Sequence, residues 1–139
     1  MPMPIEYQLA APEFERFLRD AIEASGLATR NQAYTMVQGV FQVFRRRLDV
    51  RDAVRFADIL PPMLRAIFVS DWDTDEPKCS FESRDLMTEE ARSLRRDHNF
   101  SPSTAIKDVA TALRKNVNET ELGRVLSALP KEASEFWRI

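Results

Sequence analysis

The stretch ATRNQAYTMVQGVFQVFRRRL, residues 28–48, decides the fold of this chain. Thr29 followed by Gln32 forms a capping-box pattern, which is typical of the first turn of a helix. Behind this cap, apolar side chains recur at three- and four-residue spacing and form one helical stripe. The stripe consists of Ala33, Val37, Val40, Phe41 and Phe44, and it is widened by Tyr34, Met36 and Val43. Because the apolar arc covers about half of the circumference, we predict the central helix of an all-helical fold.

The other side of this predicted helix carries Thr35, Gln38, Gly39 and Gln42. We expect these residues to face solvent, since they add little apolar surface. We interpret Gly39 as a tolerated helical glycine, which costs about 1 kcal/mol relative to alanine. A close crossing of another helix at Gly39 is the alternative.

Helical signals continue on both sides of the central stretch. Pro12 can begin an earlier helix, where its missing N–H is not needed, and Gly26 supplies a left-handed residue that ends this helix. After the central helix, Asp49 is suited to cap a short helix that Pro61 stops. Pro62, which directly follows Pro61, then opens a further short helix. These signals predict a first half of four helices, residues 12–69.

The remainder of the chain repeats these signals in the same order. A constant offset of 69 residues pairs Asp49 with Asn118 and Pro61 with Pro130. Agreement of caps, apolar stripes and stops over about twenty positions indicates an internal repeat. The second half, residues 84–139, is therefore predicted to contain four helices related to those of the first.

The long helix of the second half is expected to begin at Ser101, with Pro102 in its first turn. The complete prediction is one all-α domain, residues 1–139. It is a bundle of about eight helices formed by two related halves, which are joined by an acidic connector at residues 70–83.

This pattern resembles the bacterial family known as domain of unknown function 2267. The residues that carry the resemblance are an aliphatic helix with a basic end at Arg45–Leu48, a capped helix and a Leu-Pro stop in each half. The similarity extends roughly from Leu27 to Trp137. It implies a helical fold and a bacterial source, and it implies no activity, because no functional residue of that family transfers to this chain.

Composition excludes several functional classes. Cys79 is the only cysteine, so no disulfide forms within the chain, and we expect a reducing, cytoplasmic location. The first residues, Met1–Arg19, lack a basic leader and a long apolar run, which argues against a signal peptide or a membrane helix. With only three glycines, the chain cannot assemble a phosphate-binding glycine loop or a dinucleotide fingerprint. We expect no cofactor.

The acidic connector contains the sharpest ligand pattern. Its carboxylates occupy positions 1, 3, 5 and 12 of a helix-flanked calcium loop. These weak candidate metal ligands are Asp71, Asp73, Asp75 and Glu82. However, position 6 of such a loop needs a left-handed glycine, whereas this chain has Glu76 followed by Pro77. We therefore assign no metal site and interpret the connector as a solvated linker.

Basic and titratable residues suggest two further functions. Two groups of arginines could together track phosphates: Arg45–Arg47 at the end of the central helix, and a second stripe of Arg92, Arg95 and Arg96. The net charge of −2 argues against a dedicated nucleic-acid binder. His98, next to Asp97, could act as a general base together with a carboxylate such as Asp58 or Asp108. Because the sequence contains no convincing nucleophile near His98, we assign no catalytic residue.

Exposed aromatic and apolar surface suggests a binding role. Trp72 lies among charged residues and either packs on the core or contacts a partner, and packing is favoured. Part of the broad central helix, Tyr34, Met36 and Val43, could contact a second subunit of a homodimer. Our first hypothesis is a non-enzymatic module that binds a protein partner or itself. The alternative is a small-ligand-binding or weakly catalytic protein with a pocket between the two halves.

Overall fold

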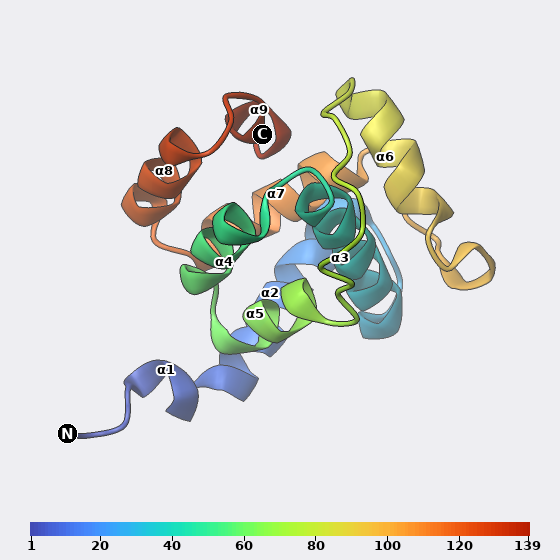
Figure 1. Cartoon of the computed structure of the whole chain (residues 1–139). Coiled ribbons are helices and arrows are strands. Elements are labelled where there is room, and N and C mark those ends of the chain that lie inside the picture. The colour runs from blue at the N-terminus through green and yellow to red at the C-terminus, as the bar shows by residue number, and fades with distance from the viewer.

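The computed structural model describes all residues 1–139, which form nine α-helices, one 3₁₀ turn and no β-strand (Figure 1). The helices are α1 (Ile5–Gln8), α2 (Ala10–Ser25), α3 (Arg30–Arg45), α4 (Val50–Asp58), α5 (Pro62–Val69), α6 (Arg84–Ser93), α7 (Ala105–Asn116), α8 (Glu119–Ala128) and α9 (Glu132–Phe136). The turn η1 (Arg96–His98) lies between α6 and α7. The predicted all-helical class is confirmed, and α1 is the additional helix. None of the helices combines the length and the apolar character needed to cross a bilayer.

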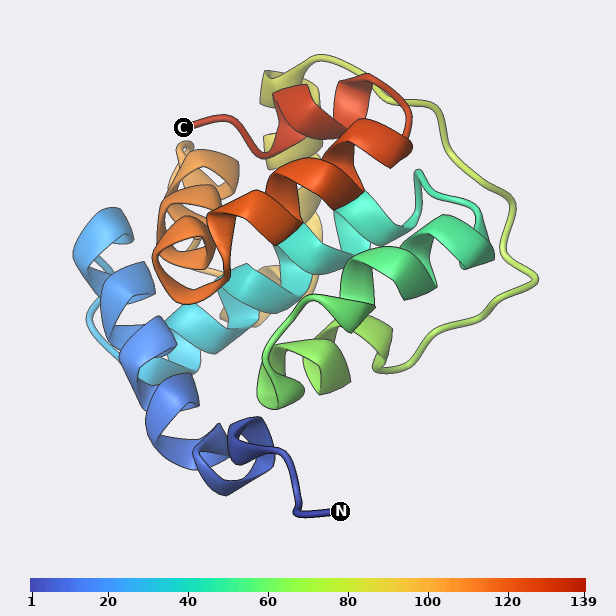
Figure 2. The same ribbon diagram turned by 90° about the vertical axis from the view of Figure 1, so that its left-hand side faces the viewer.

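Helix α3 occupies the centre of the molecule, and α2, α5, α6 and α7 pack around it (Figure 2). The Thr29 hydroxyl accepts a hydrogen bond from the backbone N–H of Gln32 at 3.1 Å. The Gln32 side chain accepts in turn from the N–H of Ala28 at 2.9 Å. These bonds satisfy backbone donors that a helix start would otherwise leave unpaired. The predicted cap and the predicted central position of this helix are confirmed.

The expected solvent-facing side of α3 is largely buried, which corrects the sequence interpretation. Thr35 and Gln38 are only 7% and 9% exposed. At Gly39, a Cβ atom would lie 2.8 Å from the carbonyl oxygen of Ala91 on α6. Helix α6 thus crosses α3 at a distance that only glycine permits. The alternative interpretation of Gly39, a close helix crossing, is the correct one, because a second helix covers a face that looks polar in the sequence.

Helices distant in the sequence interleave around a solid core. Helix α2 packs along α7, and α6 packs along α3. The Phe44 and Trp137 rings meet edge-to-face with centroids 5.3 Å apart, and Phe56 stacks on Trp137 at 5.5 Å. Aromatic pairs at these distances stabilise a core beyond the area that they bury. Side chains from α3, α4 and the end of α9 therefore fill the centre.

Helix α7 begins later than the Ser101–Pro102 pair predicts. Its N-cap is Thr104 and its first residue is Ala105. The carbonyl of Pro102 accepts from the N–H of Ala105 at 3.0 Å, and the carbonyl of Ser101 accepts from Nε of Arg92 at 2.8 Å. Because its carbonyl is held by α6, the Ser101 segment forms a turn between helices instead of the predicted helix start.

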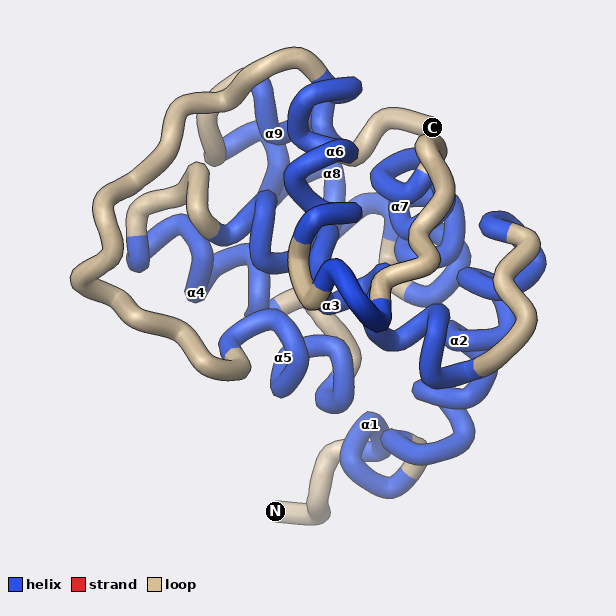
Figure 3. The backbone as a smooth tube through the Cα atoms, turned by 90° about the vertical axis from the view of Figure 1, so that its right-hand side faces the viewer, coloured by secondary structure: helices blue, strands red, loops and turns tan.

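The connector at residues 70–83 contains no helix and follows a wide arc from the end of α5 to the start of α6 (Figure 2, Figure 3). It passes the C-terminal end of α3, where the backbone N–H of Cys79 donates to the carbonyl of Arg46 at 2.9 Å. The connector is thus attached to the central helix and is not a free linker along its whole length.

Candidate functional site

The carboxylates of the connector do not form a metal site. No group of three or more acidic, histidine or cysteine side chains in the structure is arranged to hold a metal ion. Among the calcium-loop positions Asp71, Asp73, Asp75 and Glu82, Asp73 Oδ1 accepts a hydrogen bond from the backbone N–H of Asp75 at 3.0 Å. Asp73 therefore shapes a local turn within the connector.

The arginines at the end of α3 hold the connector in place. Nη1 of Arg45 donates to the carbonyls of Phe68 and Ser70 at 2.9 and 3.0 Å, and its guanidinium lies 5.3 Å from the centre of the Trp72 ring. Burial lowers the pKa of Arg45. Trp72 packs against the core, as the sequence analysis favoured. These contacts give Arg45 and Trp72 a structural role in fastening the connector.

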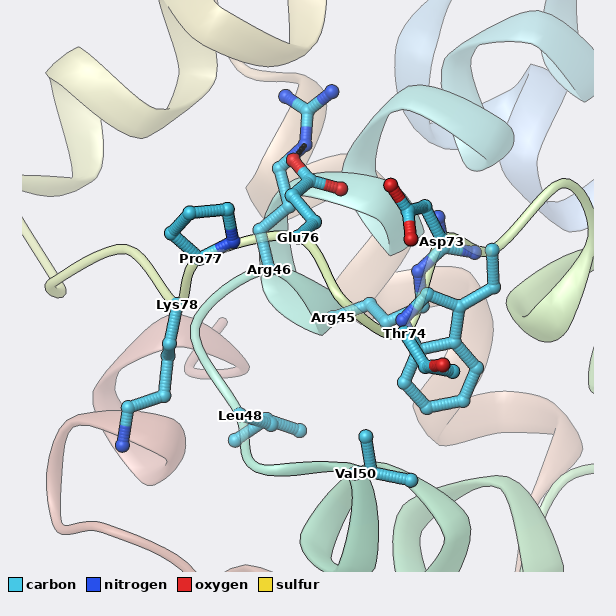
Figure 4. A pocket seen from close by; sticks show the side chains of 10 residues that line it. Arg45, Arg46, Leu48, Val50, Asp73, Thr74, Glu76, Pro77 and Lys78 are labelled. Carbon is cyan, nitrogen blue, oxygen red and sulfur yellow. Dashed lines mark ion pairs between the residues drawn. The ribbon is translucent and has the colours of Figure 1, made fainter.

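A small cavity lies between this arginine cluster and the connector (Figure 4). Its volume is about 30 Å³, so it has room for about one water molecule and none for an organic ligand. Figure 4 shows Arg46 and Glu76 side by side at one end, with Nε of Arg46 3.3 Å from the Glu76 carboxylate. Lys78 points away from the cavity and pairs with Asp49 at 3.1 Å.

Arg47 is the most deeply anchored residue of the cluster, with a side chain only 2% exposed. Its guanidinium donates two hydrogen bonds to Glu90 on α6, at 2.9 and 3.0 Å, and one to the carbonyl of Ser80 at 3.1 Å. These bonds lower the pKa of the Glu90 carboxyl. Because Arg45 and Arg47 are buried and donate to acceptors within the chain, they are not available to phosphate groups.

The predicted subunit-contact residues separate into two groups. Met36 and Val43 are completely buried in the core, so the expectation that they contact a second subunit is wrong. They face neighbouring helices because α3 is covered on nearly all sides. Tyr34 is only partly buried and remains accessible at the start of α3.

The structure does not place the candidate catalytic residues in one site. Asp108 is 6% exposed, and its Oδ2 accepts a hydrogen bond from the Thr104 hydroxyl at 2.7 Å. Burial raises the pKa of Asp108. His98 lines a surface groove that includes neither Asp108 nor Asp58. Neither carboxylate therefore orients His98 there.

This groove, the α3 groove, is the best candidate for a functional site. Its volume is about 420 Å³, within the usual range for binding pockets. The first turns of α3 form one wall and the α6–α7 loop forms the other. The lining residues are Asn31, Gln32, Tyr34, Thr35, Arg95, His98 and Phe100.

The α6–α7 loop presents its side chains from a braced backbone. The side-chain amide of Asn99 donates to the carbonyls of Ala91 and Leu94 at 2.9 and 2.7 Å. Arg95 has a left-handed backbone with a φ of 52°, a conformation that costs a non-glycine residue roughly 1–2 kcal/mol. Strained conformations of this kind concentrate at functional sites. Phe100, further along the same loop, is 62% exposed.

Residues 14–136 match the family described as "Uncharacterized conserved protein (DUF2267)". The chain belongs to this family. The resemblance drawn from the sequence is thus confirmed, and all residues of the α3 groove lie within the part of the chain that matches DUF2267. No curated protein matches the chain.

Sequence reasoning identified Tyr34 and His98 in this DUF2267 chain but missed the groove that they share. Phe100 was a detectable signal, because it is a large apolar residue in a polar loop. The left-handed conformation of Arg95 has no sequence signal, since glycine or asparagine is the usual residue there. Asn31 and Gln32 can be recognised as lining residues of the groove only when α3 and the α6–α7 loop are placed together in space.

Proposed function

We propose that this DUF2267 protein is a non-enzymatic module that binds a segment of a partner protein in the α3 groove. The observation that carries the proposal is that two accessible aromatic residues, Tyr34 and Phe100, line one groove together with the cationic Arg95 on a braced loop. Tyrosine and arginine are the side chains that most often dominate protein interfaces, and aromatic residues are enriched there. A loop fixed before binding also reduces the ordering cost of association.

The packing of the core supports this hypothesis over a ligand pocket between the two halves. Phe44, Phe56 and Trp137 are completely buried and occupy the space where α3, α4 and α9 meet. The carboxylate with a raised pKa, Asp108, lies outside the α3 groove. The perturbed acid and the accessible groove are therefore separate features, whereas a catalytic pocket would combine them.

Affinity capture with matched variants tests the proposal. We expect the wild-type chain to retain a protein from a lysate of its host and the Phe100→Ala variant to lose it. Leu86→Ala is the control, because Leu86 is 59% exposed on α6 and does not line the groove. Equal capture by all three chains would contradict a role for the α3 groove.

A second copy of the chain is the alternative partner. Tyr34 remains accessible for such a contact, whereas Met36 and Val43 do not. Light scattering at micromolar concentration checks this alternative, and a monomeric mass contradicts it. We further propose a reducing, cytoplasmic location, which the exposed, unpaired Cys79 supports.

We also infer that residues 12–69 and 84–139 are related halves. Nη1 of Arg45 donates to the carbonyl of Phe68, and Nε of Arg114 donates to the carbonyl of Trp137, both at 2.9 Å. Donors and acceptors are both separated by the offset of 69 residues. The pairing of α2 with α7 and of α6 with α3 supports the same correspondence. Loss of this offset among other family members would contradict the inference.

A further inference from the structure

The charges of the α3 groove have one sign. Arg95 and His98 are its only basic side chains, and no aspartate or glutamate lines it. Arg95 makes one long hydrogen bond, 3.4 Å from its Nη1 to Oε1 of Gln38, and takes part in no ion pair. Its charge is therefore available to an anionic group.

The uncharged polar groups of the groove also favour an acceptor in the ligand. Oε1 of Gln32 already accepts from the N–H of Ala28, so the side chain offers its amide N–H groups to the groove. The side chain of Asn31 makes no hydrogen bond within the chain and can serve a peptide backbone. Gln32 and Arg95 thus offer donors to an acceptor group of the ligand.

Apolar surface occupies the rest of the groove. Phe100 exposes 62% of its surface, and Tyr34 lies partly exposed on the opposite wall. A ring placed against these two residues would leave water and gain aromatic contact. A volume of about 420 Å³ suits a short stretch of peptide side chains.

We propose that the α3 groove recognises a peptide segment in which an aromatic side chain is flanked by carboxylates. The ring packs against Tyr34 and Phe100, and a carboxylate pairs with Arg95. This inference rests on the proposed function and specifies the chemistry of the partner.

Charge complementarity favours such a peptide over a nucleic acid. A phosphate backbone needs a row of cations, whereas the groove offers Arg95 and His98 only. Nearby, Arg92 is paired with Glu89 at 2.6 Å, and Asp97 lies within the loop itself. The groove therefore carries enough positive charge to pair with one carboxylate and too little to bind a row of phosphates.

Fluorescence anisotropy with four labelled peptides tests the chemistry. The probes are an acidic peptide with a central phenylalanine, the same peptide with alanine at the centre, an amide version with asparagine and glutamine, and a basic version with lysine and arginine. We expect the acidic phenylalanine peptide to bind at least tenfold more tightly than the others. Its affinity should fall as salt is raised, because ionic strength screens accessible charges.

Variants of the chain locate the binding. Arg95→Gln should weaken binding of the acidic phenylalanine peptide at least tenfold. Arg95→Gly should do the same while folding at least as well, because glycine accepts the left-handed backbone without strain. Arg124→Gln is the control, since Arg124 is an exposed arginine on α8 without an ion pair. Equal losses in all three variants would overturn the assignment of Arg95.

Other outcomes overturn the inference in distinct ways. Tighter binding of an oligothymidylate would indicate a nucleic-acid site, and equally tight binding of free phenylacetate would indicate a small-molecule site. Failure of all four peptides while protein capture still depends on Phe100 would reject this ligand chemistry and retain the proposed function. Failure of both experiments would reject the proposed function as well.

Discussion

The contact between Arg47 and Glu90 shows how one residue fastens two distant segments. Arg47 reaches the connector through Ser80 and α6 through Glu90, with little of its side chain exposed. A buried guanidinium needs such partners, because an uncompensated charge in the interior is strongly destabilising. Arg45, Arg46 and Arg47, which look like a basic patch in the sequence, therefore mainly hold the connector and α6 against the end of α3.

Replacing Glu90 by glutamine removes the charge of this pair and keeps the shape of the side chain. We expect the free energy of unfolding at pH 7 to fall by about 2 kcal/mol, the scale of a hydrogen bond to a charged group. The folded pKa of Glu90 lies below its ordinary value of 4.5. The contribution is therefore complete above pH 4.5 and is lost as the pH falls through the depressed folded pKa.

Urea unfolding at neutral pH and at about pH 3 measures this difference. The destabilisation by Glu90→Gln should shrink in acid. Glu89→Gln is the matched control, because Glu89 is 63% exposed and an exposed ion pair contributes little. An equal effect of both substitutions at pH 7 would contradict the role given to Glu90.

Among the elements, the crossing of α3 and α6 depends on a missing side chain. A Cβ at Gly39 would meet the Ala91 carbonyl oxygen at 2.8 Å, a backbone atom that cannot rotate away. Gly123 on α8, in contrast, has no neighbouring atom within 4 Å of such a Cβ. The two helical glycines are thus opposite cases within one chain.

We expect Gly39→Ala to lower the free energy of unfolding by roughly 2 kcal/mol, because overpacking outweighs the better helix propensity of alanine. Gly123→Ala should raise it by up to about 1 kcal/mol, since only propensity changes there. Thermal unfolding followed by circular dichroism measures both shifts. A stabilised Gly39→Ala variant would show that α6 does not press on α3 at this point.

The starts and ends of helices were predictable where the residues that determine them are neighbours in the sequence. The Thr29 cap, the left-handed Gly26 and the Asn118 cap depend on neighbouring residues, and the structure contains all three. Gly39 and Ser101 were misjudged because their roles depend on α6, a helix distant from Gly39 in the sequence. The α3 groove was missed for the same reason, since two separate segments create it.

At the scale of the whole molecule, the helices of the two halves pack between one another, and we therefore predict that the chain unfolds as one cooperative unit. Helix α2 packs most extensively against α7, and α6 packs most extensively against α3. Trp137 lies in the shared core, whereas Trp72 lies on the connector. In a Trp72→Phe variant, Trp137 fluorescence therefore reports the core alone.

We expect the fluorescence of this variant and its helical circular dichroism to change at the same urea concentration, because a two-state domain loses both together. Two separated transitions would show that the halves unfold independently. The wild-type chain, measured by circular dichroism alone, is the control for the effect of the substitution itself.

The pairing of α2 with α7 also bears on synthesis. A ribosome makes α2 well before α7. During translation, the face of α2 that packs on α7 therefore stays uncovered until α7 has been made. Packing around α2 is consequently completed only after α7 has left the ribosome.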